Sequence, residues 1–125
     1  MGTVYVVQNP MRYDPEQGCV VPRYDLAPAE RFGKLRVLFE ERTSLRPEEA
    51  KRAIAKMNLV LESFTDDDYL LLIGNPALIG YATTLAAVHN GGKVRMLVWS
   101  GRDKDYGVVE SRLPIAGDRD RSSER

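Results

Sequence analysis

The chain of 125 residues has few of the side chains on which catalysis and metal binding depend. It contains one cysteine, Cys19, and one histidine, His89, which excludes an internal disulfide, a multi-cysteine metal site and a metal shared by two histidines. His89 falls in the last turn of an expected helix, where a cationic ring suits the helix dipole. The other polar residues offer no base, nucleophile and stabilising group that one fold would bring together. The sequence therefore predicts no catalytic residue, no metal and no cofactor, and favours a protein that is not an enzyme.

Strong net charge and long apolar runs are also missing. Lysine plus arginine and aspartate plus glutamate both number 18, so no global bias attracts nucleic acid or an anionic membrane surface. No apolar run approaches the roughly 18 residues that a membrane-spanning helix needs. The start of the chain, MGTVYVVQNP, lacks the basic and apolar parts of a signal peptide. We therefore expect a cytoplasmic protein that makes no contact with a membrane.

What is present is the pattern of a small α/β domain. Four strands are expected from runs that are apolar throughout or alternate with a two-residue period, over residues 3–8, 34–41, 69–74 and 93–100. A further strand over 106–113 follows a short turn and should pair with the last of them. With helices between the strands, the sequence predicts a small sandwich with a mainly parallel central sheet, two main helices and a C-terminal β-hairpin. Residues 1–115 form this single domain, and the polar residues 116–125 are expected to be a disordered tail.

The two main helices are expected after residue 46 and over residues 76–89. Pro47 suits a first helical position, with Ser44 or Arg46 before it as the cap. The first helix carries one apolar stripe that is predicted to face the core: Ala50, Ile54, Met57, Leu61 and Phe64. A shorter helical turn is expected over 25–33, capped by Asp25. Cys19, beside two valines, is expected to be a small buried hydrophobe.

The junction after the third expected strand is the place where a ligand would bind, if any does. Gly74 is followed by a helix start, whose unpaired N–H groups attract anions. Neither the dinucleotide fingerprint nor the phosphate-binding loop is present, because Pro76 and Ile79 stand where glycines are required and no lysine follows. A structural role for the junction is therefore favoured. A small-anion or nucleotide site is the alternative, and its residues would be Gly74, Asn75, Ala77, Leu78, Asn9, Ser100 and Arg102, which lie at the carboxyl ends of the expected strands.

The second helix is apolar on most sides and carries a stripe of small residues. Such a flat face lies close against a sheet or against a second copy of the chain. The residues that would form the interface of a homodimer are Gly80, Thr83, Thr84 and Ala87.

Two other clusters have a functional and a structural interpretation. Asp66, Asp67 and Asp68 could attract a cation, but a solvated acidic loop is favoured because they precede a strand, opposite the expected cleft. Trp99 and Tyr106, among arginines and a lysine, could stack on single-stranded nucleic acid. Interleaved acidic residues cancel that positive charge, so ordinary cross-strand pairing in a hairpin is favoured.

Several short motifs between residues 25 and 106 resemble a family of small proteins encoded by tailed phages and integrated prophages. They are Phe32-Gly33, Asp68-Tyr69-Leu70-Leu71, Gly74-Asn75-Pro76 and Trp99. Ser100 departs from the pattern, which has an aspartate after the tryptophan. The resemblance implies a viral or mobile-element origin, and it carries no activity or site residue over to this chain.

These observations together predict a phage accessory protein that works without catalysis in the host cell cytoplasm. It would bind a host or phage protein and so modulate host processes or defence, with a homodimer expected from the small-residue helix face or an open sheet edge. A small-anion or nucleotide-binding protein is the second interpretation. A weak single-stranded nucleic-acid binder is the third.

Overall fold

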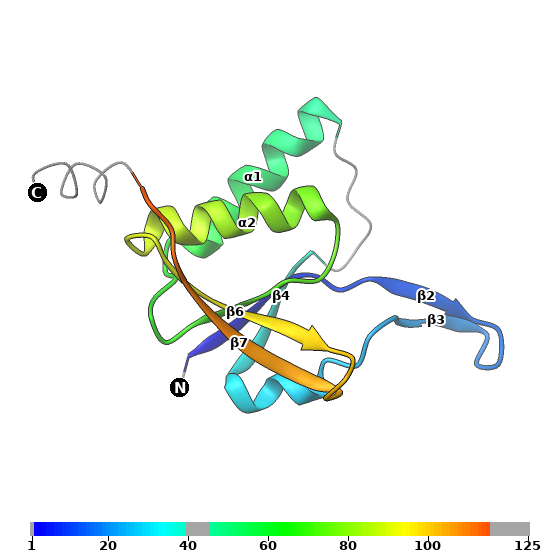
Figure 1. The fold of residues 1–125 in the computed structure, drawn as a ribbon. Helices are drawn as coiled ribbons and strands as arrows, with labels where there is room; N and C mark the ends of the chain where they lie inside the picture. The colour runs from blue at the N-terminus through cyan, green and yellow to red at the C-terminus, as the bar shows by residue number, and fades with distance from the viewer. Residues whose placement is uncertain (1, 40–45, 116–125) are drawn as a thin grey trace, which may run out of the picture.

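The core of the protein is one five-stranded sheet, seen in a computed structural model that describes residues 2–39 and 46–115 (Figure 1). The strand order is β4-β1-β5-β6-β7. The first four strands in this order are parallel, and β7 is antiparallel to β6. Their bounds are β1 Thr3–Gln8, β4 Lys34–Phe39, β5 Tyr69–Leu71, β6 Lys93–Ser100 and β7 Asp105–Arg112. The predicted mainly parallel sheet with a C-terminal hairpin is confirmed.

Each face of the sheet has its own apolar layer. Helices α1 (Pro47–Leu61) and α2 (Pro76–His89) lie together on one face, and the short 3₁₀ helix η1 (Ala27–Phe32) lies on the other (Figure 1). The N-cap position of η1 is Leu26 and not the predicted Asp25, which lies one residue earlier; Asp25 Oδ1 still accepts a hydrogen bond from the Ala27 N–H. No helix in the described ranges is both long enough and apolar enough to cross a membrane.

The predicted stripe is confirmed in its second half, where Met57, Leu61 and Phe64 are buried. In its first half Ala50 and Ile54 are half-buried, and Ala53 is the buried residue instead. Residues four apart form the ridge with which one helix packs on another, and α1 lies against α2 as well as the sheet. The apolar pattern within α1 alone does not reveal its contact with α2. Arg46 precedes α1 without a side-chain cap, and Ser44 lies outside the described residues.

A two-stranded ribbon extends from one end of the sheet (Figure 1). It consists of β2 (Met11–Asp14), which the sequence analysis missed, and β3 (Cys19–Pro22). The predicted burial of Cys19 is wrong, because its side chain is exposed. The ribbon pairs only with itself, so its apolar side chains have no layer to pack against; Val20 is 58% exposed.

The acidic loop before β5 is not solvated throughout. Asp66 and Asp67 are exposed, but Asp68 is buried. Its Oδ1 accepts a hydrogen bond from the Thr3 N–H at 2.8 Å, and its Oδ2 accepts from the N–H and the hydroxyl of Thr65 at 2.8 and 3.2 Å. The expectation of a solvated loop is therefore wrong for Asp68, which joins the start of β1 to the loop before β5.

Candidate functional site

The place where an open parallel sheet usually binds ligands is filled here by Gln8. The chain leaves β1 toward the η1 face and leaves β5 toward the α2 face, so a crevice is expected between the carboxyl ends of these two strands. The Gln8 N–H instead donates to the Ile73 carbonyl at 3.1 Å, and its side-chain Oε1 accepts from the Asn75 N–H at 2.8 Å. Gln8 therefore connects the end of β1 to the segment after β5 and closes the crevice between them.

The start of α2 has few donors left for an anion. The Asn75 N–H is bonded to Gln8, Pro76 has no N–H, and the Ala77 N–H donates to Asn75 Oδ1 at 2.8 Å. Asn75 is thus the helix cap that the sequence predicts. Gly74 has φ +124°, and a Cβ added there would lie 2.4 Å from Gln8 Cβ. The glycine permits this close contact with Gln8.

The other predicted ligand residues lie at or just after the ends of strands, except Leu78, which lies in α2. The Asn9 N–H donates to the Phe39 carbonyl, and the Leu78 side chain is buried in the core beneath α2. Ser100 Oγ bonds to Asp103 within the turn between β6 and β7, where Arg102 is exposed. Asn9, Leu78 and Ser100 thus make structural contacts at or near their own strand or helix ends.

The α2 residues considered for a homodimer also make contacts within the chain. Thr83 and Thr84 donate their hydroxyls to the carbonyls four residues before them, and Ala87 is buried in the core. Gly80 is exposed, with open space around it. His89, in the last turn of α2, has its Nε2 2.7 Å from Asn58 Oδ1 of α1.

A hollow of about 400 Å³ lies beside the filled crevice, and we call it the aromatic hollow. The ends of β5 and β6, the start of β7 and the segment before η1 form it. Its lining residues are Arg23, Tyr24, Asp25, Leu71, Leu72, Ile73, Leu97, Trp99 and Tyr106. The volume falls within the range of sites that hold a small molecule or a large side chain of another protein.

Three aromatic side chains line the aromatic hollow. Trp99 and Tyr106 are cross-strand partners whose rings meet edge to face with centroids 5.0 Å apart. Tyr106 is buried, whereas Trp99 and Tyr24 are 49% and 46% exposed. Burial, with Asp25 nearby, raises the pKa of the Tyr106 phenol, so the hydroxyl keeps its proton at neutral pH. The hollow thus combines two exposed rings with a buried hydrogen-bond donor.

Charge at the aromatic hollow is balanced. Arg23 supplies one cation, which lies 5.9 Å from the centroid of the Tyr24 ring, and Asp25 supplies one anion. The same three residues also line an adjoining hollow of about 340 Å³ with Asn9 and Leu26. Asn9 Oδ1 is buried there, and none of the described residues gives it a hydrogen bond. This surface therefore favours an apolar group with one hydrogen-bonding function over a phosphate.

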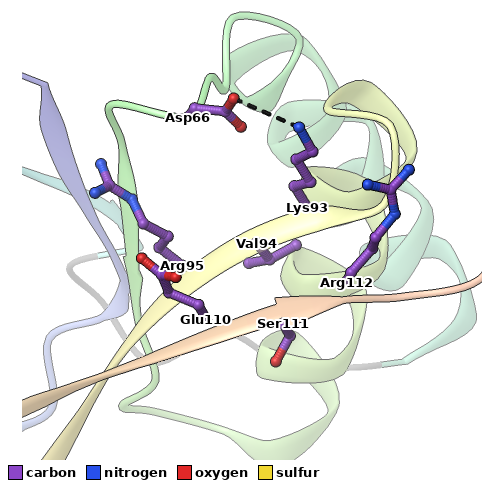
Figure 2. Close-up of a pocket in the computed structure, with 7 residues that line it drawn as sticks. All are labelled: Asp66, Lys93, Val94, Arg95, Glu110, Ser111 and Arg112. Carbon is purple, nitrogen blue, oxygen red and sulfur yellow. Dashed lines mark ion pairs between the residues drawn. The ribbon is translucent and has the colours of Figure 1, made fainter.

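A second, charged hollow of about 440 Å³ lies at the far end of the hairpin (Figure 2). Lys93, Arg95 and Arg112 supply its cations, and Asp66 and Glu110 its anions. Lys93 Nζ is 3.9 Å from Asp66 Oδ2, and the Arg95 guanidinium lies 4.1 Å from the centroid of the Tyr69 ring. Lys93 and Arg95 are thus engaged by the protein's own carboxylate and ring, although Arg95 Nε is buried without a hydrogen bond from the described residues. We place the candidate site at the aromatic hollow, where exposed aromatic rings line an apolar surface.

An ion pair fastens η1 to the rim of the candidate site. Arg31 bonds to Asp105, and this hydrogen bond is the largest influence that holds the pKa of Asp105 below its ordinary value of 3.8. A carboxyl group whose pKa is lowered by folding stabilises the protein above its unfolded pKa, and the contribution is lost as pH falls through the folded pKa.

We therefore expect Asp105→Asn to be less stable than the wild type at about pH 7, with the difference becoming smaller as pH falls below 3.8 and through the lowered pKa of Asp105. Denaturant unfolding of both proteins from neutral into acidic pH measures it. Equal stability of the two proteins at about pH 7 would contradict the role given to this carboxyl group.

Sequence reasoning identified only part of this site. The sequence marks Trp99 and Tyr106 as aromatics of a hairpin and Asp25 as the cap of a short helical turn, but no local pattern marks Arg23 or Tyr24 as part of a site. Within residues 2–39 and 46–115, no group of three His, Cys, Asp or Glu side chains could hold a metal ion.

The chain belongs to a phage protein family. The family model described as "Phage Pam3 gp32-like protein" matches residues 2–113, which is nearly the whole chain. The phage origin that the sequence motifs indicate is therefore confirmed. No curated protein and no solved structure matches the chain.

Proposed function

We propose that this phage protein acts without catalysis, by binding a protein of the host or of the phage in the host cell cytoplasm. The aromatic hollow is the binding site, and it receives an apolar side chain of the partner. The observation that carries the proposal is the pair of half-exposed rings, Trp99 and Tyr24, at the mouth of an apolar hollow. Tryptophan, tyrosine and arginine are the residues that most often dominate the energy of protein interfaces.

The chemistry of the hollow favours this ligand over the two alternatives. A nucleotide or small anion needs several positive donors, but the charges of Arg23 and Asp25 cancel and the start of α2 is engaged by Gln8 and Asn75. Single-stranded nucleic acid needs a basic track beside the rings. The cations next to the rings along the hairpin, Arg102 and Lys104, alternate with Asp103 and Asp105 at the turn, and Arg95 packs on Tyr69.

The proposal is tested by exchanging the rim aromatics for alanine. The tagged protein is purified from infected host cells, its partner is identified, and binding is then measured with the purified partner by calorimetry. We expect Trp99→Ala and Tyr24→Ala each to weaken binding by about thirty-fold, which corresponds to about 2 kcal/mol for an anchor residue. Tyr24 belongs to no strand or helix, so its removal leaves the sheet intact.

Leu59→Ala is the matched control, because this side chain is 69% exposed on α1, in the layer opposite the hollow. It should bind as the wild type does. Unchanged affinity in both aromatic variants would refute the hollow as the site. Saturable binding of a nucleotide or of a short single-stranded oligonucleotide, lost in the same variants, would refute a protein ligand.

A further inference from the structure

The outer edge of β7 carries backbone groups that are not used by the sheet. The Leu113 N–H donates to the Gly92 carbonyl at 2.6 Å, and Ser111 and Val109 continue this register opposite Val94 and Met96. Hydrogen-bonded and non-hydrogen-bonded pairs alternate along an antiparallel ladder. The even-numbered residues of β7 therefore direct their N–H and C=O groups away from β6.

Among the described residues, only the beginning of this edge is protected by side chains. The Tyr106 N–H donates to Asp105 Oδ1 at 2.8 Å, and its carbonyl accepts from Arg31 at 3.3 Å. Further along, none of the described residues bonds to the outward backbone groups of Val108 and Glu110. Val108 and Val109 are also 43% and 45% exposed. An open edge with exposed valines is a template for pairing with another strand.

We propose that a second copy of the chain occupies this edge. The two β7 strands pair antiparallel about a twofold axis at Ser111, so that one sheet runs through both copies. In this register Glu110 lies opposite the partner's Arg112, and the symmetry repeats the pair. Val109 lies opposite the partner's Leu113 on the helix-covered side.

The pairing of charged side chains favours an axis at Ser111 over an axis at a neighbouring residue. An axis at Glu110 would place two glutamates opposite each other, and an axis at Arg112 would do the same with two arginines. An axis at Val109 would set each Glu110 against a valine. With the axis at Ser111, Pro114 faces the partner's Val108, where its carbonyl can accept from the Val108 N–H, and the pairing ends there because the proline has no N–H to donate in return.

The α2 face is the weaker candidate for the same dimer. Its threonine hydroxyls are bonded within the helix and Ala87 is already buried, so the stripe of small residues offers little unused surface. The proposed interface, residues 108–114, shares no residue with the aromatic hollow, and the inference stands independently of the proposed function.

The first test is the mass of the full chain in solution, by light scattering over a range of concentrations. The wild type should have twice the 14.1 kDa mass of the chain. Val108→Pro should be monomeric and folded, because it removes an N–H that faces away from β6. Val108→Thr keeps the N–H and a β-branched side chain, and it should remain dimeric. Circular dichroism of both variants reports the fold.

The second test is the register, in a Cys19→Ser background that removes the native thiol. Ser111→Cys should form a disulfide-linked dimer on mild oxidation, because a non-hydrogen-bonded pair brings the two Cα atoms to about 4.5 Å. Val109→Cys should not, since it lies four residues along the strand from its own copy, about 13 Å away. Arg112→Glu should weaken the dimer about ten-fold by facing the partner's Glu110.

Three results would overturn the inference. They are a wild type that stays monomeric at every concentration, a dimer that survives Val108→Pro, and cross-linking of Val109→Cys in place of Ser111→Cys. A monomer that instead binds a host or phage protein through β7 would equally show that the edge does not serve a second copy.

Discussion

Replacing Gly74 with alanine should lower the free energy of unfolding by about 3 kcal/mol or more. The backbone there has φ +124°, a region that costs a residue with a side chain about 1–3 kcal/mol. The added Cβ would also lie 2.4 Å from Gln8 Cβ and 3.3 Å from Gln8 Cα. Gln8 is a buried residue at the carboxyl end of β1, an interior strand, and cannot move away without disturbing that strand.

The matched control is Gly80→Ala, a few residues along the same chain segment. Gly80 lies inside α2 with open space where a Cβ would be, so alanine should raise stability by about 0.5–1 kcal/mol. Urea unfolding followed by circular dichroism measures both changes. Equal effects of the two substitutions would show that Gln8 and Gly74 are not in contact. The expected loss also means that a variant at Gly74 cannot separate ligand binding from folding.

Replacing Asp68 with alanine should cost about 3 kcal/mol, the second large effect. The side chain is 6% exposed and accepts hydrogen bonds from two backbone N–H groups and one hydroxyl. Its removal leaves the N–H groups of Thr3 and Thr65 without their acceptor in a part-buried site, and each such loss costs about 1–3 kcal/mol. Equilibrium unfolding in urea again provides the measurement.

The neighbouring carboxyl group supplies the control for Asp68. Asp67 is exposed, and Asp67→Ala should change stability by less than about 0.5 kcal/mol. Asp68→Asn should fall between the two, because the amide keeps one acceptor oxygen and turns an NH₂ group toward a donor. If all three variants unfolded at the same urea concentration, Asp68 would have no part in holding β1 to the loop before β5.

Local patterns in the sequence were enough to predict most of the elements. The bounds of α2 follow from Asn75 as the cap and Pro76 at the first turn, features that act within a few residues of the helix start. The hairpin of β6 and β7 likewise follows from two strands joined by a short polar turn. In both cases the decisive interaction lies close by in the chain.

The features that the sequence did not reveal depend on contacts between distant segments. Gln8 closes the crevice at Asn75, 67 residues further along, and no local pattern marks a glutamine for that role. The exposure of Cys19 follows from the ribbon's lying beside the sheet, outside both apolar layers. The aromatic hollow unites Tyr24 with Trp99 through the strand order, which helix and strand patterns leave open.

The strand order also has a consequence for the time course of folding. The first strand of the chain, β1, lies inside the sheet, and its neighbours begin at Lys34 and Tyr69. During synthesis β1 therefore lacks one of its two neighbouring strands until β5 has left the ribosome, and its apolar side chains stay exposed for that time. The β6–β7 hairpin, by contrast, can close as soon as it exists, because its pairing is local. When the complete chain refolds, with all segments present at once, we expect this hairpin to form first and closure of the sheet around β1 to be the slow step.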